Sequence, residues 1–188
     1  EFGYNIKLLG IAKESNKGLS LNVYPAFVPV THPLASVRGS YNAIYVKGNG
    51  IDDAMFYGRG AGSLPTGSSV VSDIMEIAKN ISNGSTGQLK SFYYDQKNIY
   101  APGKIQSSYY IRLAVDNKTG VLAKISAKLA EQKISVLSIV QRNMDPEMAV
   151  LAIVTSKCPR SYILNLIDSF NSLRSVQSVN SVIRIMED

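Results

Sequence analysis

Residues 107–188 carry a regular alternation of hydrophobic patterns, which constrains the fold more than any other feature of the chain. Apolar residues recur at every second position where strands are expected and at helical spacing where helices are expected. The expected elements alternate as strand, helix, strand, strand, helix, strand, over residues 109–115, 121–130, 134–141, 148–155, 159–170 and 176–186. This order predicts a ferredoxin-like βαββαβ unit, with both helices on one face of an antiparallel sheet.

The first half of the chain predicts a different arrangement. Residues 4–13 and 19–28 are rich in β-formers, and the polar segment ESNKG between them favours a hairpin. Two shorter strands are expected over 43–47 and 54–57, on either side of the turn GNGIDD. A long helix with one apolar face follows, because these residues recur at helical spacing: Val70, Val71, Ile74, Ile77, Ala78 and Ile81. We therefore expect an α/β (α+β) chain, in which a partial mixed or antiparallel sheet with one long helix precedes the ferredoxin-like unit.

The predicted first half lacks the elements needed to cover its own sheet. Four strands and one helix would leave a broad apolar surface exposed. The chain also begins directly in a strand with apolar side chains on both faces. We therefore expect a piece of a larger domain or an obligate oligomer. Residues 84–106 are polar and contain glycine and proline, which predicts a linker held against a surface by Tyr93, Tyr94 and Tyr100.

A glycine turn precedes the long helix. Gly58, Gly60 and Gly62 alternate there, and either Pro65 or Thr66 could open the helix. An uncapped helix N-terminus after such a turn favours a phosphate, because bare N–H groups and the helix dipole both attract anions. The alternative, a glycine-rich connection that lets a strand and a helix pack closely, is the commoner use of such spacing. The third glycine of a G-x-G-x-x-G motif is absent.

Composition excludes several classes of function. The only cysteine is Cys158 and the only histidine is His32, which excludes an internal disulfide and argues against cysteine- or histidine-based metal sites. No apolar run reaches the roughly 18 residues of a membrane helix, and no signal-peptide pattern is present, so we expect a reducing, cytoplasmic setting. The net charge of +6 is divided evenly between residues 1–106 and 107–188, whereas nucleic-acid binders gather basic residues on one face. We predict no nucleic-acid, membrane or metal partner.

Residues 109–141, YYIRLAVDNKTGVLAKISAKLAEQKISVLSIVQ, resemble the ACT family of small amino-acid-sensing modules attached to metabolic enzymes. The family's strand, acidic turn, Gly-Val-Leu, amphipathic helix and second strand all have counterparts here. The resemblance implies that such units pair and that an effector's carboxylate is held at the helix start, by Asp116, Asn117, Gly120, Val121, Leu122 and Ser135. Asn117 stands where the family often has aspartate, and Ser135 where many amino-acid-binding members carry asparagine.

Three segments of the first half resemble, in order, the last part of homoserine dehydrogenase: FGYNIKLLGIAK (2–13), HPLASVRGSYNAIYVKG (32–48) and YGRGAGSLPTGSSVVSDIMEIAKNI (57–81). The resemblance implies the end of a catalytic and dimerisation domain over residues 1–83, a linker over 84–106 and an ACT-like regulatory domain over 107–188. It also implies that the glycine turn borders an NADP site, formed by Gly60, Ala61, Gly62 and Thr66. The family's Rossmann fingerprint and catalytic lysine have no counterpart here, so we assign no catalytic residue and expect this chain alone to be inactive.

Two hypotheses follow from these resemblances. In the first, the chain is the regulatory and dimerising C-terminal part of an NAD(P)-dependent homoserine dehydrogenase, in the biosynthesis of threonine, methionine and isoleucine. It would form a homodimer or a higher homo-oligomer and sense an amino acid, most plausibly threonine. In the second, the chain is a non-enzymatic amino-acid-binding ACT module whose first half docks onto a partner protein.

Overall fold

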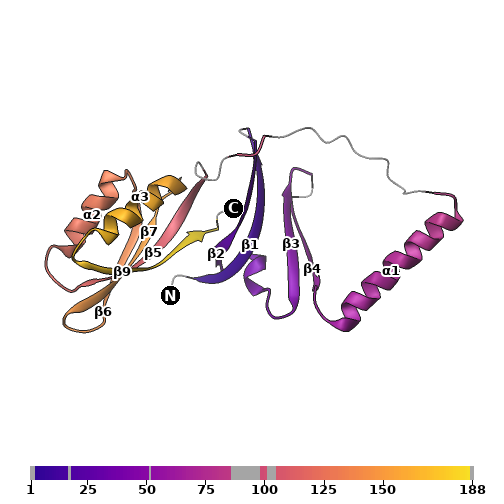
Figure 1. Cartoon of the computed structure of the whole chain (residues 1–188), viewed down its shortest axis with the longest axis horizontal. Coiled ribbons are helices and arrows are strands. Elements are labelled where there is room, and N and C mark those ends of the chain that lie inside the picture. The colour runs from indigo at the N-terminus through magenta and orange to yellow at the C-terminus, as the bar shows by residue number, and fades with distance from the viewer. Residues whose placement is uncertain (1–2, 17, 51, 86–97, 101–104, 187–188) are drawn as a thin grey trace. The chain divides into compact units, whose positions relative to one another are not determined.

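The computed structural model describes residues 3–16, 18–50, 52–85, 98–100 and 105–186 of the 188-residue chain. The chain divides into two compact units (Figure 1). The first unit comprises Glu1–Pro29 and Lys97–Asp188, and the second comprises Val30–Gln96. No helix of the described residues is long and apolar enough to cross a membrane.

The C-terminal part of the first unit has the predicted order of strands and helices. Its elements are β5 (Gln106–Asp116), α2 (Val121–Glu131), β6 (Val136–Asn143), β7 (Met148–Thr155), α3 (Arg160–Asn171) and β9 (Val176–Ile185). Neighbouring strands are antiparallel in the order β9-β5-β7-β6, and the two-residue β8 (Cys158–Pro159) pairs with β5. The predicted ferredoxin-like βαββαβ arrangement and the α+β assignment are confirmed.

The core of this part lies between one face of the sheet and the two helices. Alternate residues of β5 and the apolar stripes of α2 and α3 meet there, at most 2% exposed: Ile111, Leu113, Ile125, Leu129, Ile163, Leu166 and Phe170. Burying each of these large side chains stabilises the fold by roughly 1.5–3 kcal/mol. The strand expected from residue 134 begins two residues later, because Ile134 still donates its N–H to the Leu129 carbonyl at 2.9 Å as α2 ends.

The N-terminal hairpin extends this same sheet. β1 (Tyr4–Ser15) and β2 (Gly18–Pro29) form the predicted antiparallel hairpin, and β2 then runs parallel to β9. The parallel ladder is short: it pairs Ala26 with Arg184 and Phe27 with Ile185. Our expectation that the four N-terminal strands form one sheet was therefore wrong. The edge of β9 offers unpaired backbone groups, and the hairpin satisfies some of them.

Residues 98–100 run beside the start of β2. The Leu19 N–H donates to the Asn98 carbonyl at 2.9 Å, and the Tyr100 N–H donates to the Leu19 carbonyl at 2.8 Å. These backbone hydrogen bonds hold part of the predicted linker against the hairpin. Tyr93 and Tyr94 lie outside the described residues.

The second unit contains a separate hairpin and the long helix. Its elements are the 3-10 helix η1 (Pro33–Ser36), β3 (Tyr41–Gly48), β4 (Asp52–Arg59) and α1 (Ser63–Ser82). β3 and β4 pair only with each other among the described strands. The helix starts at Ser63, earlier than Pro65, because the proline is tolerated within a first turn that does not need its N–H.

An exposed apolar surface is present on α1, whereas the prediction concerned the faces of the N-terminal strands. No residue of this helix is buried, and its apolar face is more than half exposed at Val70, Val71, Ile74, Ile77 and Ile81. Ile44 and Phe56 of the β3–β4 hairpin are each 66% exposed. Exposed apolar surfaces of this extent are typical of places where a protein contacts another part of the same protein or another molecule.

Candidate functional site

The glycine turn forms the N-terminus of α1. Gly62 is the N-cap residue, with a φ of 122° that L-residues rarely adopt, and its carbonyl accepts the Thr66 N–H at 3.1 Å. The Gly60 N–H donates to the Ser40 carbonyl at 3.2 Å, and a Cβ at Gly60 would clash with the Asn42 side chain. The structure thus brings Gly60, Ala61, Gly62 and Thr66 together around one helix start.

This helix start has the chemistry of an anion site. No side chain among the described residues caps it, so the main-chain N–H groups of Ser63 and Leu64 face outward at the positive end of the helix dipole. Thr66 is exposed one turn further along. The arrangement fits an anionic group such as a cofactor phosphate.

The side chains at the end of β5 form a second candidate site. Gln177 Nε2 donates to Asp116 Oδ1 at 2.7 Å, and Lys118 Nζ lies 3.3 Å from Asp116 Oδ2. The Gln177 hydrogen bond and the Lys118 ammonium lower the pKa of Asp116 below its usual value. The Asn117 N–H donates to the Glu147 carbonyl at 2.7 Å. These bonds give the turn before α2 a defined shape.

The start of α2 lies beside this turn. Gly120 is the N-cap residue in the left-handed conformation, with φ of 85°, and nothing lies within 4 Å of the position a Cβ would take. Val121 is buried in the core, and Leu122 is 42% exposed. Asp116 to Leu122 therefore form a continuous surface around an uncapped helix start.

Ser135 does not join that surface within one chain. Its carbonyl accepts the Ser156 N–H at 2.9 Å and the Ser156 hydroxyl at 3.1 Å. Along β7, Met148 lies opposite Asp116 whereas Thr155 lies opposite Val136, so Ser135 and Asp116 mark opposite ends of the strand. The separation is about 23 Å at the usual rise of about 3.3 Å per residue. A single pocket holding all six predicted residues would require a second chain.

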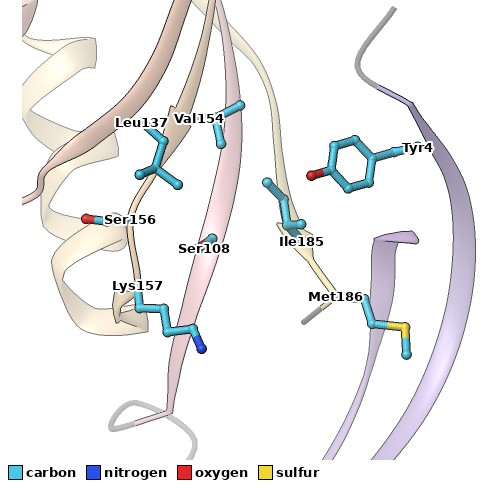
Figure 2. Close-up of a pocket in the computed structure, with 8 residues that line it drawn as sticks. All are labelled: Tyr4, Ser108, Leu137, Val154, Ser156, Lys157, Ile185 and Met186. Atoms are coloured by element: carbon cyan, nitrogen blue, oxygen red, sulfur yellow. The ribbon is translucent and has the colours of Figure 1, made fainter. Parts of the chain in front are cut away.

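A hollow of about 420 Å³ lies on the face of the first unit's sheet opposite the helices (Figure 2). Its lining side chains come from β1, β5, β6, β7, β9 and the residues that follow β7 and β9: Tyr4, Ser108, Leu137, Val154, Ser156, Lys157, Ile185 and Met186. Sequence reasoning missed this group, because only strand pairing between distant segments brings these residues together.

The two other titratable residues considered as candidates, His32 and Cys158, lie in environments that suit a structural role. His32 Nδ1 accepts the Leu34 N–H at 3.1 Å, so His32 caps η1. The centroids of the His32 and Tyr45 rings lie 4.6 Å apart. Burial raises the pKa of the Cys158 thiol, which keeps it protonated and unreactive. Among the described residues, no group of three His, Cys, Asp or Glu side chains could hold a metal ion.

Comparison with known proteins connects these features to one family. The homoserine dehydrogenase family pattern matches residues 1–75. Homoserine dehydrogenase of Bacillus subtilis is 35% identical over 185 residues, which covers 97% of this chain and 43% of the relative. The Corynebacterium glutamicum enzyme is 36% identical, over 99% of this chain and 42% of the relative.

A solved structure extends the match to the fold. The homoserine dehydrogenase of Thiobacillus denitrificans superposes with a TM-score of 0.85 at 30% identity, over 98% of this chain and 43% of that one. The chain therefore spans less than half the length of the relatives it matches. In sequence and in fold, this chain corresponds to the C-terminal part of the homoserine dehydrogenases.

Proposed function

We propose that this chain is the regulatory and dimerising C-terminal part of an NAD(P)-dependent homoserine dehydrogenase. The observation that carries the proposal is collinear similarity, over 97% of the chain, to relatives of which it covers 43%. The parent enzyme would interconvert aspartate 4-semialdehyde and homoserine by hydride transfer with the nicotinamide cofactor. The dinucleotide fingerprint and the catalytic lysine implied by the family have no counterpart in this chain, so we expect the chain alone to be inactive.

Gly60, Ala61, Gly62 and Thr66 would border the cofactor, for which we favour NADP. The support is the uncapped start of α1, where the N–H groups of Ser63 and Leu64 can hold an anionic group of the cofactor. Glycine at position 62 allows the φ of 122° that brings backbone close to a ligand.

The exposed face of α1 would pack against the preceding part of the parent enzyme. Val70, Ile74 and Ile77 are 52%, 59% and 57% exposed in this chain, and the match covers only 43% of the Bacillus subtilis relative. Burial of such a face is the usual source of helix stability in a folded domain. We retain residues 1–83, 84–106 and 107–188 as proposed modules of the parent, although the compact units of this chain follow a different division.

The ACT-like part would sense an amino acid, threonine being our first choice, at an interface between two copies. The support is the separation of Ser135 from the Asp116 turn, since a second copy is needed to bring them into one pocket. An uncapped helix start at Gly120 could hold the effector's carboxylate. Regulation then requires that threonine bind one arrangement of the enzyme better than another.

Steady-state kinetics of the full-length parent tests the cofactor role. Gly62→Asp places a carboxylate and a strained backbone at the proposed site, and should raise the KM for the dinucleotide by at least about tenfold. Gly67→Ala, inside α1 with open space around it, is the matched control and should leave the KM unchanged. Unchanged cofactor affinity in a folded Gly62→Asp enzyme would favour the alternative, a non-enzymatic module that docks through α1.

Calorimetric titration of this chain tests the effector role. L-threonine is titrated beside L-serine, L-methionine and L-isoleucine, while sedimentation velocity reports the oligomeric state. Saturable binding should stabilise the folded chain by about 2.7 kcal/mol at a hundredfold excess over the dissociation constant. The absence of a binding signal for all four amino acids, in a chain that sedimentation shows to be dimeric, would contradict effector sensing. The ACT-like part would then have only a dimerisation role.

A further inference from the structure

Arg184 is a buried cation whose terminal nitrogens have no hydrogen-bond acceptor among the described residues. The residue is 6% exposed, and both Nη1 and Nη2 are closed off from solvent. The hydroxyl of Tyr109, a residue that is 3% exposed, is likewise buried without a hydrogen-bond partner in the described part of the chain. Burying a polar group is costly unless it is hydrogen-bonded, and burying a charge costs more unless an opposite charge accompanies it. These unsatisfied atoms therefore point to a ligand.

Strand register places the unsatisfied groups on one face of the sheet. Arg184 pairs with Tyr109 of β5 and with Ala26 of β2, so the three side chains stand on the same face. Alternation along β5 puts Ile111 on this face too, and Ile111 packs in the core that α2 and α3 cover. The ring centroid of Tyr24, two residues before Ala26, lies 4.3 Å from the Arg184 guanidinium carbon. The hairpin and the ferredoxin-like part therefore meet around the Arg184 side chain.

These groups offer hydrogen-bond donors and positive charge but no acceptor. A guanidinium has five N–H donors and accepts no hydrogen bond, which makes Nη1 and Nη2 of Arg184 donors only. Burial raises the pKa of Tyr109, and the nearby Arg184 charge lowers it by less, so the hydroxyl keeps its proton at neutral pH. The Tyr24 ring offsets only part of the cost of the buried charge. The remaining cost calls for a negative charge.

A small monovalent anion meets this need better than a water molecule does. A water molecule would accept hydrogen bonds from Arg184 but would leave its charge uncompensated. A halide ion accepts from several donors and supplies the missing charge, and hydrogen bonds to ions are roughly twice as strong as neutral ones. A bulky anion such as phosphate is disfavoured, because solvent does not reach the Arg184 nitrogens or the Tyr109 hydroxyl.

We propose that Arg184 and Tyr109 bind a chloride ion at the junction of β2 and β9. The ladder that joins these strands has two residue pairs, Ala26 with Arg184 and Phe27 with Ile185. An ion that offsets the buried charge would therefore strengthen a short attachment. The hairpin lies within the segment matched by the homoserine dehydrogenase family, so the ion would hold that segment to the ACT-like part.

This site is distinct from the cofactor and effector sites proposed above, and it does not depend on the enzyme function. Tyr109 and Asp116 are separated along β5 by about 23 Å, at the usual rise of about 3.3 Å per residue. Ser135 precedes β6, and β5 and β7 lie between β6 and β9, which gives a separation of about 14 Å at about 4.8 Å per strand. The glycine turn before α1 belongs to the other compact unit.

Thermal unfolding of this chain in chloride tests the proposal. Chloride is exchanged for gluconate at constant ionic strength, so that only the anion changes. We expect the midpoint temperature to rise saturably with chloride, by at least about 3 °C at about 200 mM, as linkage requires for a ligand that binds only the folded chain. The NMR line of the chloride nucleus should broaden in the presence of the chain and narrow again when bromide is added. A midpoint that does not depend on chloride would overturn the proposal.

Two variants locate the ion. Arg184→Met removes the charge and should abolish the chloride response. Tyr109→Phe removes only the hydroxyl and should weaken chloride binding at least about fivefold, while leaving the chain at least as stable in gluconate, where that hydroxyl has no partner. The matched controls are Arg174→Met and Tyr162→Phe, at exposed positions, and both should respond to chloride as the unsubstituted chain does. Tyr109→Phe alone decides the outcome if Arg184→Met does not fold.

Two further results would overturn the assignment. A chloride response that survives both Arg184→Met and Tyr109→Phe would be a general salt effect and not binding at this site. A response that is absent from the unsubstituted chain but appears in the double variant Glu187→Gln, Asp188→Asn would show that a carboxylate of the chain pairs with Arg184. Residues 187 and 188 lie outside the described residues. Threonine binding, whatever its outcome, bears only on the effector role of the ACT-like part.

Discussion

The guanidinium carbon of Arg184 lies 4.3 Å from the centroid of the Tyr24 ring, beside the short ladder that joins β9 to β2. Arg184 is only 6% exposed, and neither of its terminal nitrogens has a hydrogen-bond partner among the described residues. Tyr109 lies opposite Arg184 on β5. Because a buried cation is costly and no described residue gives Arg184 a carboxylate partner, the Tyr24 ring offsets part of that cost through a cation–π contact. This contact joins the hairpin to the ferredoxin-like part.

We expect Tyr24→Leu to destabilise the chain through loss of this contact. The expected cost is about 1–2 kcal/mol beyond that of the same substitution in an Arg184→Met background, where no cation is present. Urea unfolding of the two single variants and the double variant gives the coupling energy. A coupling energy near zero would show that the ring does not stabilise the buried cation.

Gly18 is a second point at which the first unit is held together. Its φ is 117°, and an added Cβ would clash with the Asn98 carbonyl oxygen beside β2. We expect Gly18→Ala to lower the free energy of unfolding by about 1–3 kcal/mol, through backbone strain and displacement of residues 98–100. Gly58→Ala is the control, because Gly58 has open space and no positive φ, and its effect should be much smaller. Equal thermal stability of Gly18→Ala and the parent chain would contradict this account.

Asp116 should make the stability of the chain depend on pH at the acid end. Its pKa is lowered in the folded state, so the ionised carboxylate stabilises the fold above the unfolded pKa. This contribution is lost as the pH falls through the lower, folded pKa. Asp116→Asn should therefore be less stable than the unsubstituted chain at pH 7, and the difference should be smaller at pH 2. Unfolding in urea at both pH values measures the difference, with Asp168→Asn on the exposed side of α3 as control.

The apolar face of α1 should contribute little to the stability of this chain by itself. Ile74 is 59% exposed, so Ile74→Gln should change the free energy of unfolding by no more than about 0.5 kcal/mol. Ile125→Gln, at a position that is 0% exposed in α2, should cost more than about 3 kcal/mol. If α1 docks in the parent enzyme, Ile74→Gln should be strongly destabilising there. A small effect in the parent as well would argue against docking through this face.

Much of the local structure follows from the sequence, because local patterns encode it. The alternation along 109–115, the helical stripe of Val121, Ile125 and Leu129, and the turn residues between strands each act over a few positions. The start of α1 near Pro65 was predicted within about two residues. The structure places Gly62 and Gly120 as the N-cap residues of α1 and α2, at positive φ angles that glycine adopts more readily than other residues.

The sequence by itself determined the strands, the helices and their order, since hydrophobic periodicity and turn chemistry are local. Only the tertiary structure decided which strands pair across long separations. β2 lies beside β9, and this pairing depends on unsatisfied backbone groups that every edge strand presents alike. The pairing of β5 and β6 with β7 places Ser135 far from Asp116, and the attachment of the hairpin to β9 brings Tyr4 to a hollow that Lys157 also lines. Side chains meet across a sheet through register, which no single segment of the sequence specifies.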